Sequence, residues 1–94
     1  MMYAYVTFPD ETLVTHSEIL DREGKKAVKV HFERPTSYGF DAATCYLPSY
    51  EWVDGPLEKQ GHYTEEEINK FELFLKYNAH LLYECAENGG MGVA

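Results

Sequence analysis

Basic residues are scarce in this chain. Eight lysines and arginines stand against 16 acidic residues, which gives a formal net charge of −8. A chain of this charge repels the phosphate backbone of nucleic acids, so we expect no nucleic-acid binding. Half of the basic residues fall between positions 22 and 29, around a turn, and we interpret them as a solvated hairpin tip. The acidic balance fits a basic protein partner or simply solubility.

Long apolar runs and cysteines are also few. No run approaches the roughly 18 apolar residues that a membrane span needs, so we expect no membrane contact. Cys45 and Cys85 are the two cysteines, and neither belongs to a CxxC or Cys/His zinc pattern. Because no apolar signal segment opens the chain, we expect a cytoplasmic protein whose thiols are reduced and mostly buried. No pattern calls for a metal or a cofactor, and we expect none.

The sequence also lacks the motifs of common catalytic sites. It has no phosphate-binding glycine loop, no G-x-S-x-G, no H-E-x-x-H and no paired-carboxylate pattern. His80 and Cys85 are five residues apart on a predicted helix, so they point in different directions and cannot share a metal. His31 and Cys45 fall on opposite faces of the predicted sheet, which argues against a Cys–His nucleophile. We therefore assign no catalytic residue.

Apolar and aromatic residues are abundant. A length of 94 residues with 45% hydrophobic and 15% aromatic content predicts a single domain spanning residues 1–94. Alternation of apolar and polar residues predicts four strands, at about 2–8, 12–20, 26–34 and 41–47. Short turns join the first three into an antiparallel meander, and Pro35 is expected to end the third. The second has an ambiguous phase, because Leu13 and Ile19 point one way while Val14 and Leu20 point the other.

The period changes from two to 3.6 near Thr64. Thr64 and Glu67 form a T-x-x-E capping box, which predicts a helix at about 65–87, followed by a flexible tail at 89–94. Residues at helical spacing form one apolar stripe: Phe71, Phe74, Leu75, Asn78, Leu81, Leu82 and Cys85. A polar amide within such a stripe needs partners, so we expect Asn78 to bond to backbone outside its own helix.

Together these elements predict an α+β fold, an antiparallel sheet of about four strands with one long C-terminal helix packed on one face. A single helix leaves the other face of the sheet to water or to a partner. The alternation places tyrosine and histidine on this open face, and large amphipathic rings gain most when one side is dry. The predicted protein-binding residues are Tyr3, Tyr5, His31 and Tyr46, with Tyr50 and Trp52 at the margin. Strand propensity alone also explains the tyrosines.

The predicted helix has a second, weaker apolar face. Leu73 and Tyr77 point away from the apolar stripe, and His80 lies close by. One exposed leucine carries no meaning, but this group is a candidate for self-association.

Two classes of function follow. The leading hypothesis is a small acidic protein-interaction or regulatory module without chemistry of its own, whose partner is another protein or a second copy of itself. The alternative is a small enzyme or ligand-binding protein that uses His16, His31, Glu33 and Tyr46 around a shallow pocket on the open face. A flat open sheet excludes little water, which favours the first hypothesis.

Overall fold

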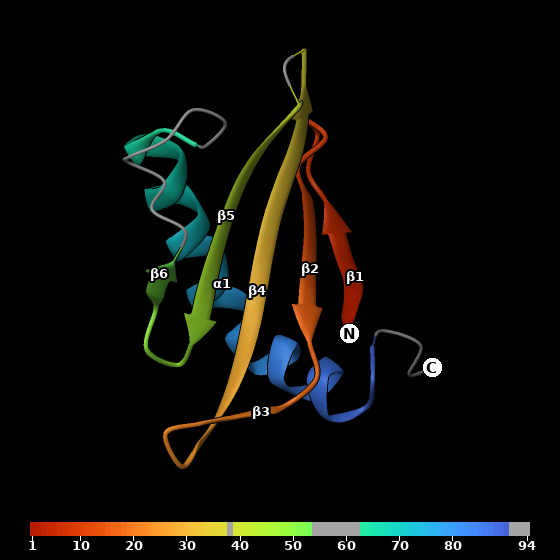
Figure 1. The fold of residues 1–94 in the computed structure, drawn as a ribbon, viewed down its shortest axis with the longest axis vertical. Helices are drawn as coiled ribbons and strands as arrows, with labels where there is room; N and C mark the ends of the chain where they lie inside the picture. Colours follow the sequence, from red (N-terminus) through yellow and green to blue (C-terminus); the bar gives the residue numbers. More distant parts are fainter. Residues whose placement is uncertain (38, 54–62, 91–94) are drawn as a thin grey trace.

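The computed structural model describes residues 1–37, 39–53 and 63–90. These residues form an antiparallel sheet with a C-terminal helix behind it (Figure 1), so the α+β class is confirmed. The described elements are β1 (Met2–Thr7), β2 (Leu13–Ser17), β3 (Leu20–Arg22), β4 (Lys25–Thr36), β5 (Gly39–Leu47), β6 (Glu51–Val53) and α1 (Glu65–Glu87). The sheet has six strands in this part of the chain, in the order β1-β2-β4-β5-β6 with β3 paired to β4. The prediction of about four strands was too low.

β4 is the centre of the sheet and pairs with β2, β3 and β5. The alternation predicted for it is confirmed, because Val28, Val30 and Phe32 are all fully buried. Its predicted end at Pro35 is wrong, since the strand continues and Pro35 pairs with Phe40 of β5. The pairing with β2 has already stopped at Glu33, so β4 is an edge strand beyond that point and tolerates proline.

The second predicted strand is broken in two. β2 and β3 are separate strands, and both pair with β4. At the break the hydroxyl of Ser17 accepts a hydrogen bond from the backbone N–H of Lys29 at 2.9 Å, where a side chain replaces the regular ladder. The break changes the alternation, so that Val14 and Ile19 both contact the core. This explains why the sequence gives two conflicting phases.

α1 has the predicted bounds and the predicted capping box. The Thr64 hydroxyl accepts from the Glu67 N–H at 3.2 Å, and the Glu67 carboxylate accepts from the Thr64 N–H at 3.0 Å. The buried face of the helix consists of Ile68, Phe71, Leu75, Leu82 and Ala86. The ring of Phe71 stacks on Phe32 of β4 with centroids 4.3 Å apart, which fixes the helix to the sheet. Of the predicted tail, residues 91–94 lie outside the described residues.

Both cysteines are free thiols. Cys45 is fully buried, as predicted, and burial raises the pKa of its thiol to about 12. Cys85 is only half-buried, and burial together with the nearby Glu84 raises the pKa of its thiol. Both thiols are therefore protonated at neutral pH and weakly reactive.

Arg34 joins several elements at one end of the sheet. Its guanidinium donates to Glu67 of α1 at 2.7 Å, to Asp41 of β5 at 2.6 and 3.1 Å, and to Asp10 of the β1–β2 connection at 3.0 Å. The same group lies 4.6 Å from the ring centroid of Tyr63, which is buried. These contacts hold the start of the helix against the sheet.

Candidate functional site

The tyrosines of β1 face the helix. The Tyr5 ring packs edge-on against Phe74 at 6.1 Å between centroids, and the Tyr3 ring lies 5.6 Å from that of His16. The prediction that Tyr3 and Tyr5 lie on the open face is therefore wrong. The physical reason is that the helix offers the Tyr5 ring an apolar surface and its hydroxyl an acceptor, while the outward positions Met2 and Ala4 are exposed.

Asn78 is that acceptor. Its Oδ1 accepts from the Tyr5 hydroxyl at 2.8 Å, and its Nδ2 donates to the Phe74 carbonyl of its own helix at 2.8 Å. The prediction of a bond to backbone outside the helix is wrong, since the partner outside the helix is a side chain. The amide is satisfied on both sides, which explains how a polar residue stands at this half-buried position.

His16 is buried on the helix side of the sheet. Its Nδ1 lies 2.8 Å from the Ser17 carbonyl, and among the described residues its Nε2 has no hydrogen-bond partner. The prediction that His16 lies on the open face holds only if Leu13 points toward the core. Leu13 is instead 39% exposed, while Val14 is fully buried. His16 therefore cannot act together with His31 and Glu33.

Trp52 and Tyr50 also lie away from the open face. Trp52 pairs with Cys45, packs 5.8 Å from the Phe32 ring and donates its Nε1–H to Glu72 of α1 at 2.9 Å. Tyr50 is half-buried against the core. β6 is the edge strand of the sheet, so Trp52 does lie at its margin, but the pairing with β5 turns its ring toward the helix and away from the open face. The sequence pattern predicts no strand after residue 47 and so does not show this orientation.

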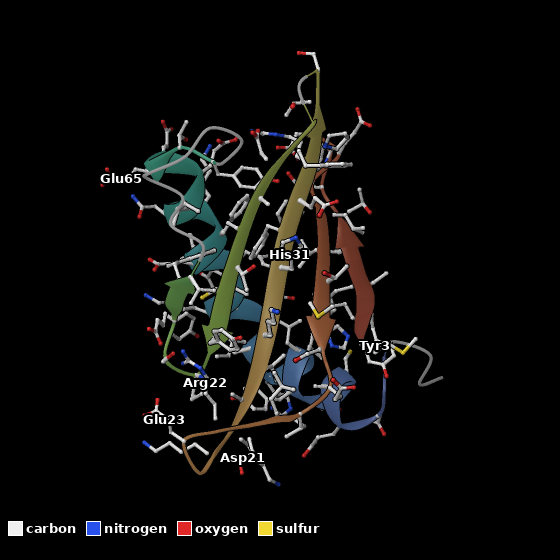
Figure 2. The ribbon with its side chains drawn as sticks, in the orientation of Figure 1. Tyr3, Asp21, Arg22, Glu23, His31 and Glu65 are labelled. Atoms are coloured by element: carbon white, nitrogen blue, oxygen red, sulfur yellow. The ribbon has the colours of Figure 1, made fainter. Side chains whose placement is uncertain are left out.

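His31 and Tyr46 remain on the open face, where Figure 2 shows His31 near the middle of β4, on the side turned away from α1. The His31 Nδ1 lies 2.8 Å from the Thr44 hydroxyl, and its Nε2 lies 3.2 Å from the Glu33 carboxylate. The Tyr46 ring lies under the guanidinium of Arg22 at 4.1 Å. The polar groups of this face are thus bonded to one another.

The Thr44 hydroxyl, the His31 imidazole and the Glu33 carboxylate follow one another in the order found in catalytic triads, where a nucleophile is activated by a base that an acid orients. Burial argues against that use, because Thr44 is 1% exposed and its hydroxyl offers no room for a substrate. His31 and Cys45 lie on opposite faces, as predicted, since His31 pairs with Thr44 and Cys45 with Val30. The interactions of His31 with Thr44 and Glu33 link β4 and β5 across the open face, so we assign these residues a structural role.

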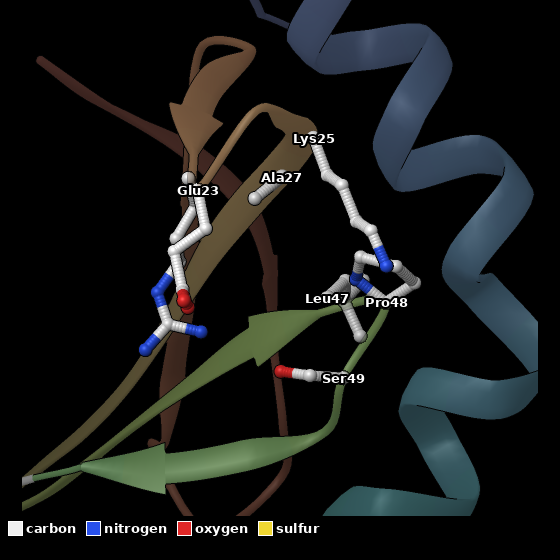
Figure 3. Close-up of a pocket in the computed structure, with 7 residues that line it drawn as sticks. Glu23, Lys25, Ala27, Leu47, Pro48 and Ser49 are labelled. Atoms are coloured by element: carbon white, nitrogen blue, oxygen red, sulfur yellow. The ribbon is translucent and has the colours of Figure 1, made fainter.

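Two of the cavities lined by described residues lie between different elements and have room for a small ligand. One of about 360 Å³ lies between the β3–β4 hairpin and the β5–β6 turn (Figure 3), and Arg22, Glu23 and Lys25 give it charges of both signs. Arg22 donates to Glu51 at 2.7 Å, so its charge is already paired. The other, of about 420 Å³, lies between the end of β1 and α1, with Phe8, Phe71 and Phe74 in its wall. Neither combines converging polar groups with an enclosed shape.

Metal binding and membrane spanning find no support in the described residues. No three His, Cys, Asp or Glu side chains there are grouped to hold an ion. Within the same residues, no helix has both the length and the apolar character to cross a membrane.

The outer face of α1 carries an apolar row. Leu73 is 55% exposed, Tyr77 79% and Leu81 51%, and we call these three residues the outer stripe. The assignment of Leu81 to the buried face is wrong, because it lies six residues after the buried Leu75 and so roughly 120° around the helix. Leu73 and Tyr77 point away from the core, as predicted. His80 is exposed beside them and lies 3.1 Å from Glu84.

Comparison of the chain with known protein families, with curated proteins and with solved structures finds no match. The candidate site is therefore defined by the geometry of the molecule, and the outer stripe places three exposed apolar side chains on successive turns of one helix.

Proposed function

We propose that this protein is a non-catalytic interaction module that binds another protein chain through the outer stripe of α1. The observation that carries the proposal is that Leu73, Tyr77 and Leu81 are all more than half exposed on successive turns of one helix. Isolated apolar residues on a surface need no explanation. A row at positions i, i+4 and i+8 lies along one side of a helix, as do the anchors at i, i+3, i+4 and i+7 with which an amphipathic helix docks into a groove of a partner.

The chemistry of the stripe suits binding. Tyrosine is one of the residues most enriched at the centre of protein interfaces, and Tyr77 stands between the two leucines with 79% of its surface exposed. The helix that carries the stripe is fixed by a capping box and by buried contacts to the sheet. A rigid element loses little conformational entropy on docking, which favours association.

The open face of the sheet is a weaker candidate. The groups that would make contacts there, His31 and Tyr46, already interact with Thr44, Glu33 and Arg22. A partner would have to replace these interactions before it gained any free energy. The apolar side chains of the outer stripe have, among the described residues, no hydrogen bonds or ion pairs that a partner would have to replace.

The proposal is tested by replacing Leu73 and Tyr77 together with lysine. Leu13→Lys is the matched control, because Leu13 is an exposed leucine on the open sheet face, 39% exposed. The measurements are light scattering across a range of protein concentrations and the recovery of bound protein by the tagged chain from a lysate of its native host. We expect the wild type and the control to associate, and the double variant to lose at least tenfold in affinity.

Circular dichroism verifies that each variant is folded. A double variant that binds as well as the wild type would exclude the stripe as the contact surface. A loss confined to the Leu13→Lys variant would move the site to the open sheet face.

A further inference from the structure

We propose that the partner of the outer stripe is a second copy of this chain, with the two α1 helices antiparallel and meeting at Tyr77. This inference rests on the proposed function and names its partner. It follows from the order of apolar and charged residues along the outer face of the helix, which is self-complementary about Tyr77.

The apolar residues are placed symmetrically. Leu73 lies four residues before Tyr77, and Leu81 lies four residues after it. In an antiparallel pair centred on Tyr77, residues at equal distances before and after it come to the same height. Leu73 of one copy therefore meets Leu81 of the other, and the two Tyr77 rings lie side by side at the centre.

The charged residues at the two ends of the stripe have opposite sign. Lys70 lies seven residues before Tyr77 and Glu84 seven residues after it, and both are exposed. The antiparallel pair brings Lys70 of each copy to Glu84 of the other, roughly 10 Å from the centre at a rise of ~1.5 Å per residue. A parallel pair would place lysine against lysine and glutamate against glutamate. The charges thus select the antiparallel arrangement.

The remaining residues of this face do not oppose the pairing. Glu66 lies 11 residues before Tyr77, and the residue 11 positions after it is the neutral Asn88. The carboxylate of Glu84 lies 3.1 Å from His80, which is itself highly exposed, so Glu84 stays within reach of an incoming lysine. In the acidic first turn, Glu67 comes to the height of Glu87 of the other copy. These two residues lie roughly 80° from Tyr77 around the helix, on opposite sides of the outer stripe, and Glu67 already accepts a hydrogen bond from Arg34.

The affinity should be modest. The chain has a net charge of −8, so two copies repel each other at long range. Three apolar side chains from each copy form a smaller contact than the roughly 1,600 Å² of a standard interface. We therefore expect a dimer that forms at micromolar concentration or above. Added salt weakens both the attraction between Lys70 and Glu84 and the long-range repulsion between the two copies. A salt series therefore cannot separate the two effects, and the charge pairs are tested by substitution instead.

The test is a charge exchange between copies, measured by sedimentation equilibrium. Lys70→Glu places glutamate against glutamate at both ends, and Glu84→Lys places lysine against lysine, so each variant alone should dimerise about tenfold more weakly than the wild type. An equimolar mixture of the two variants restores two opposite-charge pairs in the mixed dimer, and we expect wild-type affinity from it. Lys76→Glu is the matched control, because Lys76 is exposed on the same helix but outside the stripe and the substitution changes the net charge equally. It should weaken the dimer far less than Lys70→Glu does.

A mixture that associates no better than the single variants would overturn the antiparallel pairing, and so would a wild type that stays monomeric at millimolar concentration. If the Leu73 and Tyr77 double variant nevertheless loses a different protein, the proposed function stands with another partner. If that double variant loses nothing, both proposals fail.

Discussion

The residue that best illustrates how the core is specified is Asn78. Its amide links β1 to α1 through the Tyr5 hydroxyl, between residues separated by 73 positions in the chain. Sequence spacing shows that Asn78 falls in the apolar stripe and needs a partner, but no local pattern identifies a side chain so distant. The half-buried hydrogen bond between Tyr5 and Asn78, together with the packing of the Tyr5 ring on Phe74, therefore holds this face of β1 inward.

Asn78→Leu should lower the free energy of unfolding by about 1–3 kcal/mol, because the Tyr5 hydroxyl loses its acceptor. Tyr5→Phe should cost a similar amount. The Asn78→Leu, Tyr5→Phe double variant should cost less than the sum of the two single variants, since both members of this half-buried pair are removed and neither is left without its partner. Urea denaturation of the four proteins measures this coupling. Strictly additive effects would show that the two side chains do not interact.

At the scale of elements, α1 could be predicted almost to the residue because all its signals are local. The capping box and the 3.6 period lie within residues 64–87. β6 could not be found this way, since three residues form a strand only through pairing with β5. The phase of β1 was misjudged for the same reason: its alternation is clear, but which side faces the helix depends on distant contacts. Of the outer stripe, helical spacing predicts the outward position of Leu73 and Tyr77 correctly, but it places Leu81 on the buried face.

The contacts of Arg34 make the joint between sheet and helix sensitive to acid. Burial alone would raise the pKa of Asp10, but hydrogen bonds from the backbone and side chain of Thr12 and from Arg34 outweigh it, so the pKa is lowered. Burial would likewise raise the pKa of Glu67, and hydrogen bonds from Arg34 and Thr64 lower it. Carboxylates whose pKa is depressed by folding stabilise the protein above their ordinary pKa of about 4, and this stability is lost as pH falls further.

We therefore expect the free energy of unfolding to be nearly constant above about pH 5 and to fall below about pH 4. Arg34→Met should lower the stability at neutral pH by more than about 2 kcal/mol and reduce the further loss in acid. Denaturation curves from pH 2 to pH 7 provide the measurement. Arg22→Met is the control, because the pair of Arg22 with Glu51 lies at the surface and should contribute little. Equal acid sensitivity in wild type and Arg34→Met would contradict this role.

At the scale of the whole molecule, α1 covers one face of the sheet and leaves two outer surfaces of different character (Figure 1). On the open face of the sheet, polar side chains bond to one another around His31. On the outer face of the helix, three large apolar side chains meet water. Water contact favours the first arrangement and disfavours the second, which is why we place the contact surface on the helix.

The most direct measurement is the NMR spectrum of isotope-labelled protein at increasing concentration, with each backbone amide resolved. We predict chemical-shift changes that grow with concentration and are confined to the outer face of α1, from Lys70 through Tyr77 to Glu84, while the shifts of His31, Thr44 and Tyr46 stay constant. The same spectra of the Leu73 and Tyr77 double variant should show no concentration dependence. Changes centred on His31 and Tyr46, or a spectrum that does not change up to millimolar concentration, would contradict self-association through the outer stripe.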